Sequence, residues 1–217
     1  MIYLLAAGGL WEVRNLSGNL GLAFAGGAAC CREAGWVSWD TVPAFTGTLR
    51  AAYLYWTSGL WAQESGRPRP VGFIKGTRED TLSPDTFYIA LTSSGDSIVV
   101  MRKEVTYLLR ADPSGPVGCR KLGSEPGFAW ALVLVYENPS LPLARVSFLE
   151  GCLALEGGSW SGPVSLGLVP SNPWGYLLLF SVGGEGTWSG DMGRFGALTL
   201  SNSRNPSNNI GNETLYD

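Results

Sequence analysis

Short apolar runs separated by glycine, proline, serine and asparagine recur along this chain, and sustained helical periodicity is almost absent. Apolar runs of about four to eight residues between such turn-forming residues are typical of β-strands. The clearest runs predict strands at Leu49–Thr57, Thr86–Leu91, Ser97–Arg102, Phe128–Glu137, Ala144–Leu149, Val164–Val169, Gly175–Val182 and Ala197–Leu200. Weaker patterns add Asn19–Phe24 and Val71–Lys75.

The order and spacing of these runs indicate how the strands are arranged. Ala131–Tyr136 and Tyr176–Phe180 are apolar on consecutive residues, so we expect both faces of these strands to be covered and the strands to be central. One helical turn is predicted at Lys103–Arg110, before the turn signal at Asp112–Gly115. With no long linker and no repeat, about eight to ten strands predict one all-β domain, an antiparallel β-sandwich or jelly roll.

Composition excludes several function classes. Apolar residues make up 45% of the 217 positions and charged residues 15%, with a net charge of −3, so no basic stripe exists for binding nucleic acid. The chain has nine tryptophans and no histidine, which is the commonest general acid/base and metal ligand. We therefore expect a protein that is not an enzyme and needs no cofactor.

Carboxylates near aromatic residues are the main exception. Glu150 with Glu156, and Glu185 with Asp191, form two pairs of acids close in sequence, and a glycosidase needs only two carboxylates. Exposed acids on loops explain the same pattern without catalysis. Acids beside flat rings also suit non-catalytic contact with glycans, for which the candidate residues are Trp61, Trp160, Trp188 and Asp191. Trp56 and Trp130 fall inside strongly apolar runs and are expected in the core.

The four cysteines are Cys30, Cys31, Cys119 and Cys152, and no CxxC pair accompanies them, which argues against zinc. An even count fits two disulfides formed in an oxidising compartment. Adjacent cysteines rarely bond to each other, so each of Cys30 and Cys31 would pair with one of the other two. Four buried thiols in an intracellular protein are the alternative.

Two further patterns are weak. The asparagine-rich tail is rich in oxygen ligands suited to calcium, with candidates Asn208, Asn209 and Asp217, but it lacks the spacing of a known calcium loop and fits a polar turn equally well. Asn15 and Asn212 begin the glycosylation patterns Asn-x-Ser and Asn-x-Thr, which are used only if the chain meets the glycosylation machinery.

The first residues are apolar but too few to span a bilayer, which needs about 20, so no membrane insertion is expected. We divide the chain into an apolar extension at residues 1–16 and a β-sandwich domain at 17–217. An exposed apolar strand invites pairing with another chain, which makes the extension a candidate donor strand. The side chains expected to drive this self-assembly are Ile2, Leu4, Leu5, Leu10 and Trp11. An ordinary first strand in the chain's own sheet is the alternative.

Five segments carry a resemblance to a known family: Gly18–Gly26, Val42–Ser58, Tyr107–Arg110, Gly127–Pro142 and Leu200–Thr214. In this order they resemble a β module near the start of large secreted bacterial and archaeal surface proteins, ahead of repeated β domains. The resemblance covers about a third of the chain. It implies an extracellular, non-enzymatic domain at the cell surface, and it supplies no catalytic residues.

The sequence thus predicts an extracellular, non-catalytic structural subunit or surface module. We expect its main partner to be another copy of itself, joined by the N-terminal strand into a filament. The alternative is a carbohydrate-binding or adhesive module whose exposed tryptophans contact glycans.

Overall fold

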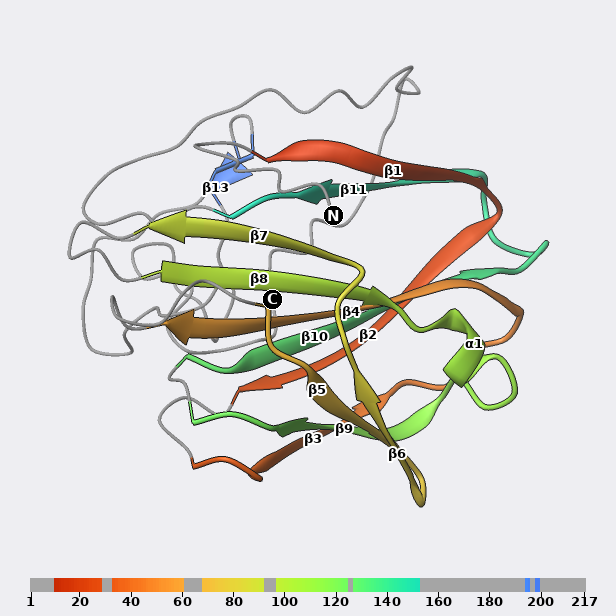
Figure 1. The fold of residues 1–217 in the computed structure, drawn as a ribbon. Coiled ribbons are helices and arrows are strands. Elements are labelled where there is room, and N and C mark those ends of the chain that lie inside the picture. Colours follow the sequence, from red (N-terminus) through yellow and green to blue (C-terminus); the bar gives the residue numbers. More distant parts are fainter. Residues whose placement is uncertain are drawn as a thin grey trace. The chain divides into compact units, whose positions relative to one another are not determined.

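In the computed structural model, the described residues are 10–28, 33–60, 68–91, 97–124, 127–152, 194–195 and 198–199. The elements are β1 (Trp11–Gly18), β2 (Leu20–Ala28), β3 (Val37–Val42), β4 (Thr48–Leu60), β5 (Val71–Lys75), β6 (Arg78–Leu82), β7 (Thr86–Leu91), β8 (Ser97–Glu104), α1 (Thr106–Leu109), β9 (Gly115–Lys121), β10 (Ala129–Glu137), β11 (Ala144–Glu150), β12 (Arg194–Phe195) and β13 (Leu198–Thr199) (Figure 1). All their strand pairings are antiparallel, so the predicted all-β antiparallel sandwich is confirmed.

The chain divides into two compact units, Met1–Leu168 and Val169–Asp217. The first contains β1 to β11 with α1, and the second contains the two-stranded pair of β12 and β13. The predicted boundary between residues 16 and 17 falls inside β1. Two predicted strands, Val164–Val169 and Gly175–Val182, lie outside the described residues.

A five-stranded sheet in the order β2-β10-β4-β8-β7 is the centre of the first unit. β10 lies between β2 and β4 and pairs with both along its length. Its side chains Leu132, Val133, Leu134 and Val135 are all buried, although they point alternately to opposite faces. The prediction that Ala131–Tyr136 forms a central strand with both faces covered is therefore confirmed.

A four-stranded sheet in the order β3-β9-β5-β6 packs on one face of the five-stranded sheet. The layer between the two sheets, which we call the inner core, is apolar and excludes solvent. Its largest fully buried members are Leu54, Trp56, Phe73, Met101, Leu109, Trp130, Leu132 and Leu134. The predicted helical turn is present as α1, which begins three residues later than expected because β8 continues to Glu104.

The opposite face of the five-stranded sheet is covered by a two-stranded ribbon of β1 and β11. Only Asn19 separates β1 from β2, and Gly18 has a φ of +144°, a conformation that L-residues with side chains rarely adopt. The backbone N–H of Asn138 donates to the carbonyl of Asn19 (2.9 Å) where the partner strands bend. The pair β2–β10 therefore continues into the pair β1–β11. Together they form one long two-stranded ribbon, which folds over at this bend.

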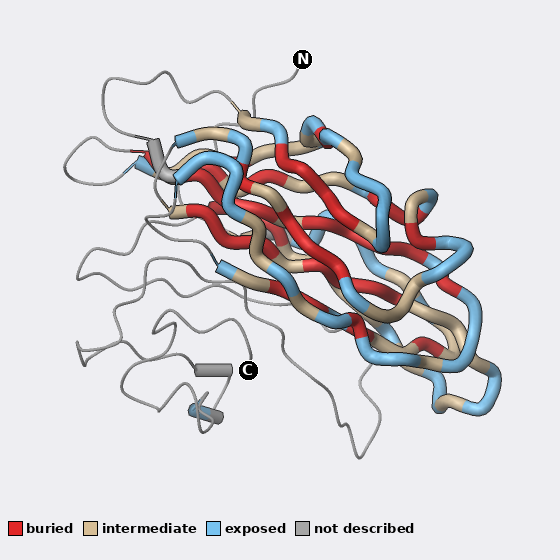
Figure 2. The backbone as a smooth tube through the Cα atoms, turned by 90° about the horizontal axis from the view of Figure 1, so that it is seen from below, coloured by how far each residue is buried: buried red, intermediate tan, exposed pale blue. Residues whose placement is uncertain are grey.

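The ribbon creates a second apolar layer, the outer core. It consists of Leu20, Ala51, Tyr53 and Val135, covered by Leu16, Leu22, Tyr55, Ala144, Val146 and Phe148. Figure 2 shows buried backbone along the middles of the strands and exposed turns at their ends. Three layers thus result, which explains why strands of the middle sheet are apolar on both faces.

Candidate functional site

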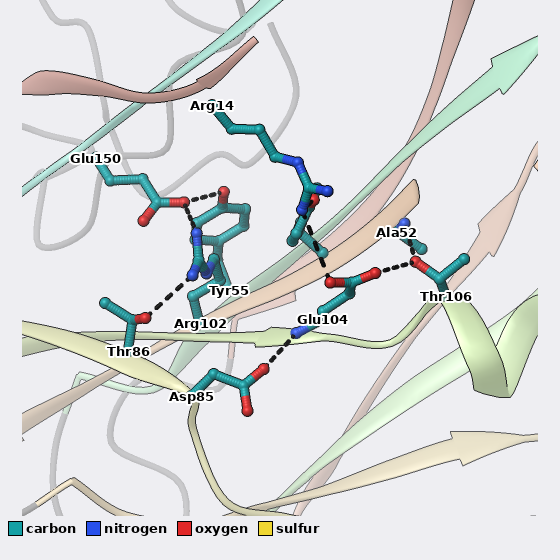
Figure 3. Close-up of polar contacts among 10 residues, drawn as sticks. Arg14, Ala52, Tyr55, Asp85, Thr86, Arg102, Glu104, Thr106 and Glu150 are labelled. Atoms are coloured by element: carbon teal, nitrogen blue, oxygen red, sulfur yellow. Dashed lines mark hydrogen bonds and ion pairs between the residues drawn. The ribbon is translucent and has the colours of Figure 1, made fainter. Parts of the chain in front are cut away.

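A buried carboxylate fastens the ribbon to the sheet beneath it. Glu150, the last residue of β11, is only 4% exposed. It accepts hydrogen bonds from the Tyr55 hydroxyl (2.7 Å) and the Arg102 guanidinium (2.8 Å) (Figure 3). The Tyr88 hydroxyl donates to its second oxygen (2.8 Å). Arg102 also donates to the Thr86 hydroxyl (3.0 Å). Four strands therefore contribute to one polar cluster.

The electrostatics of this cluster keep every donor protonated. Burial raises the pKa of the Tyr55 and Tyr88 hydroxyls, and the neighbouring Glu150 carboxylate raises them further. Burial is the largest single effect on the pKa of Arg102 and lowers it. The attraction and hydrogen bond to Glu150, together with the two tyrosines, outweigh burial, so the arginine pKa is raised. Both Glu150 oxygens accept hydrogen bonds, so the cluster attaches the end of β11 to β4, β7 and β8. Glu156, its expected partner acid, lies outside the described residues.

The other strand of the ribbon, β1, is also attached to the sheet by a charged side chain. Arg14 of β1 donates to the Tyr53 hydroxyl and lies 3.7 Å from the Glu104 carboxylate (Figure 3). The Arg14 and Arg102 guanidiniums lie 5.3 Å and 5.6 Å from the Tyr53 ring centroid, distances typical of cation–π contacts. Phe148 meets the same ring edge-on at 5.0 Å. Each ribbon strand is therefore attached by a charged side chain as well as by apolar packing.

The described tryptophan side chains divide into two classes. Trp56 and Trp130 are buried in the inner core, as predicted. Trp36, just before the edge strand β3, is 46% exposed, and Trp39 within β3 is 54% exposed. The residues predicted for glycan contact, Trp61, Trp160, Trp188 and Asp191, lie outside the described residues.

Trp39 lies flat on a glycine of the neighbouring strand. It pairs in register with Gly118 of β9. A Cβ built on Gly118 would meet three adjacent atoms of the six-membered ring of Trp39, at 2.9, 3.0 and 3.1 Å. Such nearly equal distances place Gly118 against the face of the ring, whose edge would give one short and two longer distances. The sequence did not predict this contact between Trp39 and Gly118, because the pairing of β3 with β9 joins positions far apart in the chain.

The cysteines do not follow the predicted disulfide scheme where the structure describes them. Cys119 and Cys152 are both free and buried. Cys119 belongs to the inner core, whereas the Cys152 thiol lies 3.6 Å from the carbonyl of Ile98 in β8. Cys30 and Cys31 lie outside the described residues. Burial raises the pKa of Cys119 well above its usual value and that of Cys152 to about 11.

These thiols should resist alkylation in the folded protein. The thiolate is the reactive form, and a pKa of about 11 leaves about one thousandth of Cys152 as thiolate at pH 8. We expect iodoacetamide to leave Cys119 and Cys152 unmodified in native protein and to modify both in non-reducing guanidinium chloride, measured by peptide mass spectrometry. Modification only after a reductant is added would show that they are in disulfides instead.

The remaining predicted site residues are placed as follows. Leu10 is half-buried, and Trp11 begins β1, whose partner is β11 of the same chain; Ile2, Leu4 and Leu5 lie outside the described residues. Asn15 is exposed on β1, and its amide donates to Glu12 (2.9 Å). Asn212 and the calcium candidates Asn208, Asn209 and Asp217 also lie outside the described residues.

The hollow described in this structure is small, and the described residues form no cluster of metal ligands. A hollow beside Trp56, Pro70 and Lys121 has a volume of about 10 Å³, which is room for about one water molecule. No group of three or more metal-ligating cysteines or carboxylates occurs in the described part of the chain. Within the same part, no helix is both long enough and apolar enough to cross a bilayer.

No family model, curated protein or solved structure matches this chain.

Proposed function

We propose that this chain is a non-catalytic structural module of extracellular, cell-surface assemblies, and that its copies join by strand donation. In this proposal the apolar N-terminal segment of one copy adds to an edge strand of the next. The observation that carries the proposal is that the edge strand β7 contains no charged residue and no proline. The surface location rests on the resemblance described above.

β7 is an edge strand without any charge. It pairs with β8 on one side, and no strand among the described residues pairs with its other side. Its sequence, Thr86–Leu91, contains no charged residue and no proline, and Leu91 at its end is 70% exposed. An edge strand with neither a charged residue nor a proline lacks the usual protection against pairing with an added strand.

The other outer strands of the two large sheets are protected by devices that prevent such pairing. β6 carries three consecutive charges, Arg78, Glu79 and Asp80. β3 contains Asp40, whose carboxylate accepts the backbone N–H of Gly26 (2.8 Å) and thereby occupies a donor on β2. Charged residues and covered edges are the usual protection against edge-to-edge association. β7 therefore stands apart as the natural acceptor.

The donor is suited to this edge in length and chemistry. Residues 1–10 contain no charged side chain. Ten extended residues span about 33 Å, longer than the roughly 20 Å of a six-residue strand such as β7. The segment leads directly into β1, which Arg14 fastens to the body of its own chain. A donated segment would therefore be anchored to one copy while it pairs with another, and head-to-tail repetition builds a filament.

Two variants test donor and acceptor separately. Deleting residues 2–9 removes the donor but leaves β1 whole, and Leu91→Lys places a charge at the end of β7. We expect the unaltered chain to form oligomers or filaments, and each variant to be monomeric, in light scattering and electron microscopy. Leu143→Lys is the matched control, because Leu143 is 82% exposed but lies outside every strand. It should assemble normally.

Mixing the two variants gives the sharper test. The deletion variant keeps an intact β7, and Leu91→Lys keeps an intact donor, so together they should form a one-to-one heterodimer that cannot grow. Analytical ultracentrifugation distinguishes this species from either monomer. A monomeric unaltered chain, or continued assembly of both variants, would contradict strand donation.

A further inference from the structure

The outer face of the four-stranded sheet carries a second exposed feature, separate from the β7 edge. One face of the Trp39 ring rests on Gly118, and the side chain is 54% exposed, so its other face is open to solvent. Glycine allows this close approach, because a Cβ at position 118 would come within 2.9 Å of the ring and displace it. An indole held flat in this way is a rigid platform whose electron-rich face attracts C–H groups.

An ordered guanidinium lies on the same face. Arg120 is two residues along β9 from Gly118, so both project to one side of the sheet. It donates from Nε and Nη2 to the two oxygens of Glu79 (2.7 and 3.0 Å) and from Nη1 to the carbonyl of Gly35 (2.9 Å). These bonds fix the side chain and engage three of its five N–H groups. The other two have no partner among the described residues.

The charge balance and size of this surface indicate the class of ligand. The bidentate contact with Glu79 already compensates the charge of Arg120, which makes the site a poor one for an anion. A protein partner usually buries about 800 Å² on each side around an apolar centre. Within the four described strands of this sheet, Trp39 is the one large exposed apolar side chain, which is too little for such a centre.

We infer that Trp39, Arg120 and Glu79 form a binding site for a neutral pyranose of a polysaccharide. The C–H face of the sugar ring stacks on the indole, and its hydroxyls accept from Arg120 and donate to Glu79. Gly118 positions the ring without touching the sugar. This inference places glycan contact on β3, β9 and β6, and it does not depend on self-assembly through β7.

Equilibrium depletion of the full chain onto insoluble cellulose, chitin and mannan tests the inference. We expect retention on at least one of these polymers. Trp39→Ala should lower the partition coefficient at least tenfold, while Trp36→Ala, the matched control on the same sheet edge, should change it by less than twofold. Gly118→Ala keeps the indole but displaces it, and should lower binding at least threefold.

The outcomes separate a binding site from a merely structural tryptophan. Trp39→Ala is expected to keep the circular dichroism spectrum of the unaltered chain, because the side chain is more than half exposed. Absence of retention on all three polymers overturns the inference. So does a loss of less than threefold in Trp39→Ala, or an equal loss in Trp36→Ala. The strand-donation variants should bind the polymers normally, so failure of either proposal is visible on its own.

Discussion

Glu150→Gln is expected to lower the free energy of unfolding by about 3 kcal/mol. The substitution keeps the size of the side chain but leaves the Arg102 guanidinium without its counter-charge, and the Arg102 side chain is only 20% exposed. Removing one partner of a buried ion pair costs about 3–5 kcal/mol, because the other charge stays desolvated. We choose the lower end, since part of Arg102 reaches solvent. Urea denaturation followed by tryptophan fluorescence measures the change.

Glu79→Gln is the matched control for this prediction. It removes the same charge from an ion pair of similar length, Arg120–Glu79 at 2.7 Å, whose side chains are 34% and 37% exposed. Exposed pairs contribute about 0–1 kcal/mol because water and salt screen them. Equal losses of unfolding free energy in the two variants would contradict the role of Glu150 in attaching the ribbon to the sheet. A second check is Glu150→Met combined with Arg102→Met, which should recover part of the stability.

The second large effect is expected for Trp130→Ala, with a loss of about 3–5 kcal/mol. Trp130 is fully buried and pairs in register with Trp56 across β10 and β4, so truncation leaves a cavity between two sheets. Its indole N–H has no hydrogen-bond partner among the described residues. Trp130→Phe removes this unpaired group and leaves a smaller cavity, so we expect a smaller loss and a folded protein.

Trp36→Ala controls for the removal of a tryptophan as such. Its side chain is 46% exposed, and surface substitutions usually change stability by about 0.5 kcal/mol or less. Thermal and urea denaturation should therefore rank the variants as Trp36→Ala, Trp130→Phe and Trp130→Ala in order of increasing loss. A loss in Trp36→Ala comparable to that in Trp130→Ala would contradict the division of tryptophans into core and surface.

The sequence was most informative for strands formed by a continuous apolar run. β7 and β5 have the predicted ends, and β4, β8 and β10 differ by a few residues, because their apolar runs stand out from turn residues. β3, β6 and β9 were not predicted, and for β1 an ordinary strand of the chain's own sheet was only the alternative prediction. β6 is the charged half of a hairpin, and β9 begins with Gly115 and Pro116, so neither has a strand-like pattern. Pairing with a more apolar neighbour makes them strands.

The candidate sites were less predictable because they depend on long-range pairing. Trp56 and Trp130 were assigned to the core from apolar neighbours in the sequence, and this is confirmed. The partners of Glu150, by contrast, lie 48 to 95 positions away and come together only when the ribbon folds over the sheet. The predicted disulfide scheme rested on the number of cysteines, and that number does not reveal that Cys119 lies in the inner core.

The bend at Asn19 also has a consequence during synthesis. Asn19 and Leu141, which meet there, lie 122 positions apart. A ribosome that adds about 5–20 residues per second needs about 6–24 s to make the intervening chain. β1 and β2 therefore leave the ribosome long before β10 and β11 exist to pair with them. Folding of the first unit waits for a late segment, and the apolar residues 1–10 remain accessible to chaperones throughout that interval.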